Sequence, residues 1–272
     1  MRIAFISDIH GNVFALDSVL EDLAQEDVDQ VICLGDIAFG PQPHEAIERM
    51  RALDCPIILG NWDSWSMNGM PQAQDEIGMR LMEIGEFWAK LLTDEDRAFI
   101  RTFERTKTIP LEDGTTILCF HGSPNSFEDF IFATTSDEDL QRMFAGYQAD
   151  VLVGGHSHLQ MVRRWENSVI INPGSVGQPF RNWWPKIIRN AHWAEYGLLE
   201  VDKGRMAIDV RRTTYDVEAL LRIFRESGMP HAEWWIESWS AAGPEDVTIL
   251  ESPSAPPGPR GPGRRRPRAT TT

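Results

Sequence analysis

Long hydrophobic runs, positive charge and cysteine are all scarce in this 272-residue sequence, and each scarcity excludes a class of protein. No stretch approaches the roughly 18 apolar residues that a membrane-spanning helix needs, and the first apolar run reaches Asp8 too soon for a signal peptide. The 26 basic residues are outnumbered by 41 acidic ones, and the net charge of −15 argues against binding duplex nucleic acid through a basic face. We therefore expect a cytoplasmic protein that binds neither a membrane nor duplex nucleic acid.

Cysteine occurs only three times, at Cys33, Cys55 and Cys119, which lie far apart in the chain. An odd number at such spacing does not suit a disulfide framework or a zinc site, and it indicates buried, reduced thiols. Hydrophobic residues make up 42% of the chain, which is enough for a sizeable core in one large α/β domain or two small ones.

Short apolar runs alternate with helical patterns at the start of the chain. Strands are predicted at 3–6, 31–34 and 56–59, and apolar residues at helical spacing predict helices at 13–24 and 44–53. This β-α-β-α-β order implies parallel strands that are joined by right-handed crossovers.

The later part of the chain is predicted to hold two helices within residues 75–104, and then strands that alternate less cleanly with helices. Thr93 and Asp96 form a capping pair that is typical of the start of the second helix. The strands favour a second sheet, largely antiparallel or mixed. They are expected at 115–120, 150–153, 160–165, 169–171, 197–201 and 206–212.

Composition changes sharply near the end of the chain, where proline, glycine and arginine dominate residues 251–272. A segment without apolar periodicity has nothing to bury, so we expect a disordered tail, which is either a solvated extension or a site for an acidic partner. Residues 1–250 are expected to form a single domain with a helical insertion at about 65–106.

Seven residues of metal-ligand type stand where apolar runs end, and most have a glycine beside them. They are Asp8, His10, Asp36, Asn61, His121, His156 and His158. Asp36 follows His10 by 26 positions and Asn61 follows Asp36 by 25, which is one crossover unit each time. Parallel strands in register bring such strand ends to one edge of the sheet, where open α/β folds place their sites.

The residue types in this set indicate two metal ions rather than one. A single Asp-x-His or His-x-His pair is common without a metal, but five such blocks in order are specific. One ion does not need seven ligands, whereas two ions that share the Asp36 carboxylate do. Imidazoles with carboxylate and amide oxygens suit Mn, Fe, Zn, Co or Ni better than magnesium or calcium. Paired divalent cations about 3.5–4 Å apart are a recurring device for attacking phosphate esters.

The order Asp-x-His, Gly-Asp, Gly-Asn, His and Gly-His-x-His resembles the calcineurin-like metallophosphoesterase superfamily. Residues 7–12 and 172–177 resemble its small bacterial and archaeal phosphodiesterase branch, which is related to diadenosine tetraphosphatase and to Ser/Thr protein phosphatases. The resemblance covers about residues 1–215. It implies an α/β (α+β) fold, in which a four-layer sandwich of two mixed β-sheets is flanked by helices.

The resemblance also implies which side chains hold each ion. The first ion would be held by Asp8, His10, Asp36 and His158. The second would be held by Asp36, Asn61, His121 and His156. Asp36 would bridge the two ions, and a metal-bridging hydroxide would attack phosphorus in line.

Further positions are implied for catalysis and substrate binding. Asn12 and Arg181 join Asp36 and Asn61 as catalytic candidates, and Asn12, Asn61, Trp62 and Arg181 are the candidates for binding substrate. Two of these have plainer alternatives, because Asn12 is also suited to bracing the loop after the first histidine and Arg181 to an exposed ion pair.

One position departs from the superfamily pattern. Many members carry a histidine directly after the motif asparagine, where it protonates the leaving oxygen, and this chain has Trp62. An indole cannot shuttle a proton near neutral pH, so we expect a preference for leaving groups that need little acid help. His44 is either a substitute acid or a surface residue in the first turn of a helix, and Asp63 is either a helix cap or a catalytic group.

The function predicted on these grounds is a two-metal phosphoesterase that acts on small phosphodiesters or nucleotides. The alternatives within enzymes are a dinucleoside polyphosphate hydrolase and a Ser/Thr phosphoprotein phosphatase. A non-catalytic scaffold of the same fold would have lost metal ligands, and this chain retains all seven.

Overall fold

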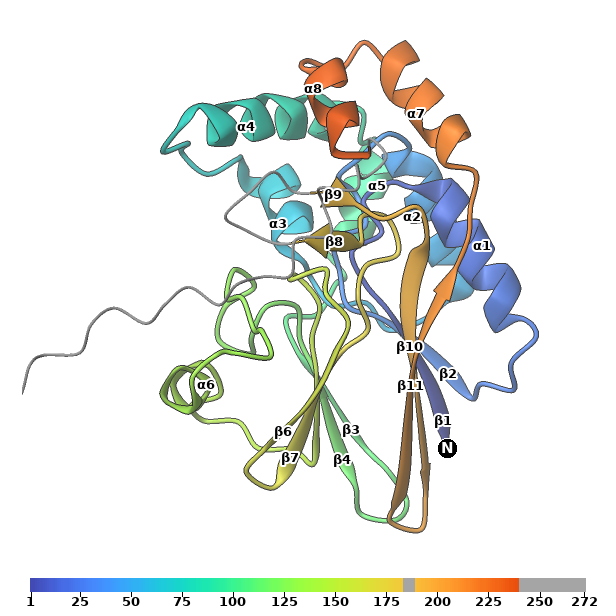
Figure 1. The fold of residues 1–272 in the computed structure, drawn as a ribbon, viewed down its shortest axis with the longest axis vertical. Helices are drawn as coiled ribbons and strands as arrows, with labels where there is room; N and C mark the ends of the chain where they lie inside the picture. The colour runs from blue at the N-terminus through green and yellow to red at the C-terminus, as the bar shows by residue number, and fades with distance from the viewer. Residues whose placement is uncertain (183–188, 240–272) are drawn as a thin grey trace, which may run out of the picture. The chain divides into compact units, whose positions relative to one another are not determined.

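The first sheet is built from β1 (Arg2–Ile6), β2 (Gln30–Cys33), β10 (Ala194–Asp202) and β11 (Arg205–Thr213) (Figure 1). Its strand order is β11-β10-β1-β2, with β1 parallel to β2 and antiparallel to β10. The computed structural model describes residues 1–182 and 189–239 of the chain.

The second sheet has five strands in the order β3-β4-β5-β7-β6. They are β3 (Lys107–Pro110), β4 (Thr116–Cys119), β5 (Val151–Val153), β6 (Met161–Trp165) and β7 (Ser168–Asn172). The three central strands are parallel and the two edge strands antiparallel, so the sheet is mixed as predicted. A short ribbon pairs β8 (Phe180–Asn182) with β9 (Arg189–Asn190).

The helices begin where capping residues stand. Asn12 caps α1 (Val13–Leu23), Pro43 opens α2 (Pro43–Leu53), and Asp75 caps α4 (Glu76–Ala89). The predicted pair Thr93 and Asp96 forms a capping box at α5 (Asp94–Ile100). The remaining helices are α3 (Asn61–Asn68), α6 (Asp137–Met143), α7 (Val217–Glu226), α8 (Ala232–Ile236) and a 3₁₀ turn at Glu237–Trp239.

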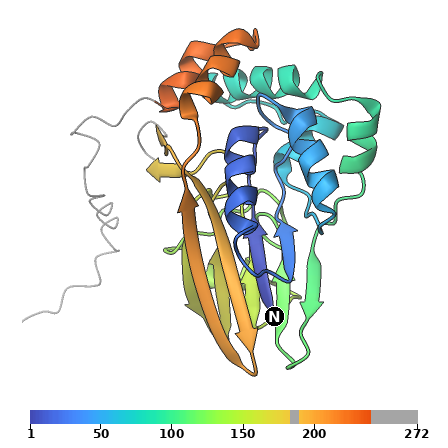
Figure 2. The same cartoon turned by 90° about the vertical axis from the view of Figure 1, so that its right-hand side faces the viewer.

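Three hydrophobic clusters separate four layers. Ile3 and Phe5 of β1 pack with Ile117 and Val151 of the second sheet, so the two sheets share an inner core. A second cluster fills the space between the other face of the first sheet and α1 and α2, and a third lies between the second sheet and α6. Figure 2 shows α1 against the strands of the first sheet. The predicted sandwich of two mixed sheets flanked by helices is therefore confirmed.

The sheet predicted for two of the strands was wrong, and one predicted strand does not form. β10 and β11 belong to the first sheet, because the free edge of β1 takes β10 as its antiparallel partner while Leu199 and Val201 enter the shared core. The segment 56–59 is not a regular strand. Ile57 and Ile58 make only isolated parallel bridges, to Cys33 and Glu104 respectively.

Helices α7 and α8, which follow the last predicted strand in the chain, contribute to a further apolar cluster. Trp88 of α4, Phe224 of α7 and Trp239 pack there with Phe39. None of the helices in residues 1–182 and 189–239 is long and apolar enough to cross a membrane. The predicted tail at 251–272 lies outside the described residues, and the boundaries of the predicted domain and helical insertion remain predictions.

Candidate metal centre

The structure brings all seven predicted ligands to one place, at the carboxyl ends of the central strands. Asp8 and His10 follow β1, Asp36 follows β2, His121 follows β4, and the last two histidines follow β5. Asn61 is the first residue of α3. Six of the seven are buried and His156 is partly buried, so each side chain is fixed by its surroundings.

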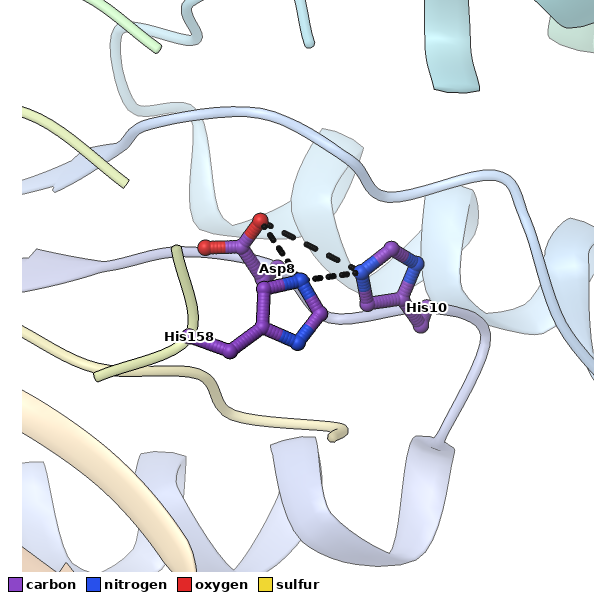
Figure 3. Close-up of side chains that lie close together, drawn as sticks. All are labelled: Asp8, His10 and His158. Atoms are coloured by element: carbon purple, nitrogen blue, oxygen red, sulfur yellow. Dashed lines mark hydrogen bonds and ion pairs between the residues drawn. The ribbon is translucent and has the colours of Figure 1, made fainter. Parts of the chain in front are cut away.

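The first cluster consists of Asp8, His10 and His158, which point toward one another (Figure 3). The two imidazole Nε2 atoms are 3.1 Å apart, and Asp8 Oδ1 lies 3.3 Å from Nε2 of His158 and 4.0 Å from that of His10. Asp8 Oδ1 is buried and accepts no hydrogen bond. A buried carboxylate oxygen facing two imidazole nitrogens is an arrangement that a cation would satisfy.

The second cluster surrounds the amide oxygen of Asn61. That oxygen lies 3.0 Å from His121 Nε2 and close to His156 Nδ1 and Asp36 Oδ2, all of which carry lone pairs when His121 is neutral. Turning the amide over would let its nitrogen donate to these atoms, at 2.8 to 3.2 Å. With the oxygen inward, four acceptors converge, which is the arrangement that a metal ion requires.

Asp36 lies between the two clusters. Its Oδ2 is 3.4 Å from His121 Nε2 and 3.9 Å from His10 Nε2, so one oxygen faces both sets. Its Oδ1 accepts a hydrogen bond of 2.8 Å from the backbone N–H of Trp62. This geometry suits the bridging role that the resemblance implied for Asp36.

Backbone carbonyls orient two of the imidazoles. His121 Nδ1 lies 2.7 Å from the carbonyl oxygen of Leu34, and His158 Nδ1 lies 2.7 Å from that of Gln178. A proton held at Nδ1 leaves the lone pair on Nε2, which in both residues faces the cluster. The orientation is therefore the one that a metal-binding imidazole needs.

Burial and neighbouring charge set the protonation states of the ligands. Burial acts to raise the pKa of Asp8, but His158, His121 and His10 together outweigh it, so the pKa is lowered. The pKa of Asp36 is likewise lowered against burial, by His121 and His10 together. Burial and His158 lower the pKa of His10 to about 4. Ionised carboxylates and a neutral imidazole are the forms that bind cations.

The two imidazoles of the second cluster have pKa values shifted in opposite directions. Burial and the charge of His121 lower the pKa of His156 to about 3. For His121, burial acts to lower the pKa, but Asp36 and Asp8 outweigh it and raise the pKa to about 9. In the protein without metal, the proton on His121 therefore supplies positive charge where a cation would otherwise stand.

Five ligands have a left-handed backbone, which is uncommon outside glycine. They are Asp8, His10, Asp36, His156 and His158, with φ between 49° and 65°. Such strain gathers at functional sites, where surrounding hydrogen bonds hold it. Here the N–H groups of Asp8 and His10 donate to the carbonyls of Gly35 and Asp36, both at 2.9 Å.

The loop at 172–178 forms hydrogen bonds with the loop that carries Asp8 and His10. Asn12 donates through Nδ2 to the carbonyl of Gly177 at 3.0 Å, and its Oδ1 accepts from Ala15 at the start of α1. A Cβ on Gly177 would lie 1.9 Å from the carbonyl oxygen of Ile9, so only glycine fits there. Both ends of the Asn12 amide are used in bracing, which is the alternative that the sequence left open.

The remaining candidates for substrate binding are Trp62 and Arg181. The ring of Trp62 stacks on Phe39 with centroids 3.8 Å apart and packs into the apolar cluster beside α4, and Phe39 in turn meets the ring of His10 edge-on. Arg181 is exposed on β8. A substrate contact by Trp62 or Arg181 therefore remains a prediction.

Sequence reasoning missed the aromatic rings that pack against the ligands. Phe130 stacks on His156 with centroids 4.1 Å apart, and Phe180 stacks on His158 at 4.3 Å. We call Phe39, Phe130 and Phe180 the aromatic rim. None of them stands in a metal-binding motif, so no local signal in the sequence identifies the rim.

His44 belongs to a separate pair on the surface. Its Nδ1 lies 3.0 Å from Oδ1 of Asp96, and half of its side chain is exposed. The bond to Asp96 raises the pKa of His44 above its ordinary value. This placement favours the surface alternative over a substitute acid.

We expect His44→Ala to leave turnover little changed and to lower stability in a pH-dependent way. Because the folded-state pKa is raised, the stabilisation is fully present below the unfolded value of about 6.5 and is lost as pH rises through the folded value. The loss of melting temperature should be larger at pH 6 than at pH 9, from a pair worth at most about 1 kcal/mol. Arg51→Ala is the control, because it removes an ion pair with Glu48 on the same helix that contains no imidazole. An equal loss at both pH values for His44→Ala would contradict the assignment.

Comparison with known proteins gives consistent matches. A family model, described as the calcineurin-like phosphoesterase superfamily domain, matches residues 1–204. Protein MJ0912 of Methanocaldococcus jannaschii is 26% identical over 85% of this chain and 94% of its own length. Phosphodiesterase YfcE of Escherichia coli K12 is 26% identical over 74% of this chain and 89% of its own length.

Solved structures show the same architecture. A metallophosphoesterase from Sphaerobacter thermophilus is 25% identical, with a TM-score of 0.65 over 85% of this chain and 96% of that one. Protein PH1004 from Pyrococcus horikoshii has a TM-score of 0.72 over 89% of this chain and 99% of its own, at 21% identity, which is a similarity of fold.

Proposed function

Since the chain belongs to the calcineurin-like phosphoesterase superfamily and is a phosphoric ester hydrolase, we propose that it uses two metal ions to hydrolyse phosphodiesters, including diesters of nucleosides. The observation that carries the proposal is the position of Asp36, whose Oδ2 faces both ligand clusters. An oxygen that faces both clusters supports a paired centre over two independent sites.

The site would act on a phosphate through the charge of the bound cations, and its ligands hold those cations in a fixed orientation. When bound, two divalent cations would neutralise charge on the phosphoryl oxygens and activate a water for in-line attack. Their formal charge of +4 exceeds the −2 of Asp8 and Asp36, so the centre attracts a phosphate in spite of the acidic chain. His121 and His158, fixed by backbone carbonyls, keep their Nε2 lone pairs directed inward.

The surroundings of the ligands favour a diester over more highly charged substrates. Within the part of the chain that the structure describes, none of the seven ligands forms a hydrogen bond or ion pair with lysine or arginine. A phosphodiester carries one negative charge, whereas a monoester or a polyphosphate carries more. Within the aromatic rim Phe39 is buried, whereas Phe130 is 36% exposed and offers apolar surface beside His156. We infer a diester with a flat substituent, such as a nucleobase or an aryl group.

A metal-loaded substrate screen tests this function. The protein is stripped with a chelator, reloaded with Mn, Fe, Zn, Co or Ni, and assayed against aryl and nucleoside phosphodiesters, phosphomonoesters, dinucleoside polyphosphates and a phosphopeptide. We expect activity only after reloading, two ions per chain by elemental analysis, and the highest kcat/KM for the diesters. Protein that binds no metal after reloading and hydrolyses none of these would favour a scaffold, and a preference for monoesters would overturn the substrate class.

A further inference from the structure

A buried carboxylate outside the ligand set ties two ligand-bearing segments together. Asp63 is fully buried and accepts hydrogen bonds from four backbone N–H groups. Its Oδ2 accepts from Asp36 at 2.7 Å and from Gly60 at 3.2 Å. Its Oδ1 accepts from Ile37 at 2.9 Å and from Ala38 at 3.1 Å.

These bonds join the loop after β2 to the start of α3, beyond the point where the backbone bonds between Cys33 and residues 56–58 end. Asp36 lies in the loop after β2, whereas Gly60 is the N-cap of α3, directly before Asn61. Asp63 itself stands in the first turn of α3, where the unpaired N–H groups of the helix favour a negative charge. One carboxylate therefore sets where Asp36 lies relative to Asn61.

The loop that carries Asp36 lies in direct contact with Gly60 at the start of α3. A Cβ placed on Gly60 would lie 2.0 Å from Oδ1 of Asp36, so backbone and carboxylate are already in direct contact. The N–H of Trp62 then donates to that same Oδ1. With Oδ1 engaged by α3, Oδ2 of Asp36 is left facing the histidines.

We propose that Asp63 is a positioning residue that builds the second metal position, the one formed by Asp36, Asn61, His121 and His156. The inference rests on the metal-binding part of the proposed function. Both oxygens of Asp63 are occupied by backbone N–H groups, so it touches neither metal nor substrate. The first position depends on it less, because Asp36 is its one ligand on the segment that Asp63 binds, whereas the 172–178 loop also holds Asp8 and His158.

Metal titration of Asp63→Asn measures this role. An asparagine keeps the shape, but its NH₂ group faces N–H donors that the carboxylate had satisfied. We expect calorimetric titration with Mn²⁺ to show first-site affinity within about threefold of wild type and second-site affinity reduced by roughly 10–100-fold, as when a partner of a metal ligand is lost. Electron paramagnetic resonance of the loaded protein should show a spin-coupled pair in wild type and mainly isolated Mn²⁺ in the variant.

Asp96→Asn is the matched control. Asp96 is likewise fully buried and accepts from Thr93 in the first turn of α5, but it contacts no ligand-bearing loop. It should lower the melting temperature without changing the affinity of either metal position. Asp63→Ser, whose hydroxyl still accepts one N–H, is a second variant for the case in which Asp63→Asn folds poorly.

The titrations separate failure of the two-metal function from failure of the positioning role of Asp63. Wild type that binds only one ion would overturn the two-metal function itself. If wild type binds two ions and both Asp63 variants keep the second affinity, the positioning role is wrong. It is equally wrong if the Asp63 variants lose both positions together or if Asp96→Asn loses the second position to the same extent, because Asp63 would then act only on general stability.

Discussion

Asp36→Asn should abolish turnover, with the largest effect of any single substitution in this chain. Replacing Oδ2 by a neutral amide removes one negative charge from a side chain that faces both clusters. Loss of an outer-shell partner of a metal already costs about 10–100-fold, so we expect a loss in kcat/KM on the order of 10³-fold or more. Steady-state hydrolysis of an aryl phosphodiester, with metal content measured in parallel, checks this.

A remote aspartate provides the control for that substitution. Asp22→Asn removes a carboxylate that accepts the hydroxyl of Tyr196 at 2.6 Å, near the end of α1 distant from Asn12. This variant should keep its metals and its turnover. Near-native turnover by Asp36→Asn with metal bound would show that the bridging assignment is wrong.

The second large effect concerns the leaving group. Trp62 stands where many superfamily members carry the histidine that protonates the leaving oxygen. Its ring packs on Phe39. The other candidate acid, His44, is bound to Asp96 on the surface. General acid catalysis is worth roughly 10²–10⁴-fold, so diesters with alkyl leaving groups should be slower than activated aryl diesters by at least that additional factor.

A series of aryl and alkyl phosphodiesters with graded leaving-group pKa measures this dependence. We expect log kcat/KM to fall steeply as the leaving-group pKa rises. Trp62→Phe keeps an aromatic ring against Phe39 and should leave the slope unchanged, because the indole takes no part in proton transfer. A flat dependence in wild type would mean that another group protonates the leaving oxygen.

The ligand set is the part of this protein that could be proposed from its sequence. Asp8, His10 and the later motif residues each follow an apolar run, and parallel strands in register bring their ends to one edge. Helix starts were equally accessible, as the Thr93–Asp96 capping box shows, because capping depends on residues only three positions apart.

The choice between alternatives needed contacts between distant segments. Sequence allowed Asn12 to bind phosphate or to brace a loop, and its bond to Gly177 provides the bracing. It allowed Asp63 to be a cap or a catalytic group, and the four backbone donors that surround it make it a structural link.

The sequence by itself determined which side chains can bind metal and roughly where strands and helices begin, because those signals are local. Only the tertiary structure decided that β10 pairs with β1, that the ring of Trp62 turns toward Phe39, and that aromatic rings cover the histidines. The physical reason is that strand pairing and side-chain packing depend on partners far away in the chain, and alternating or apolar patterns do not specify which partner is met.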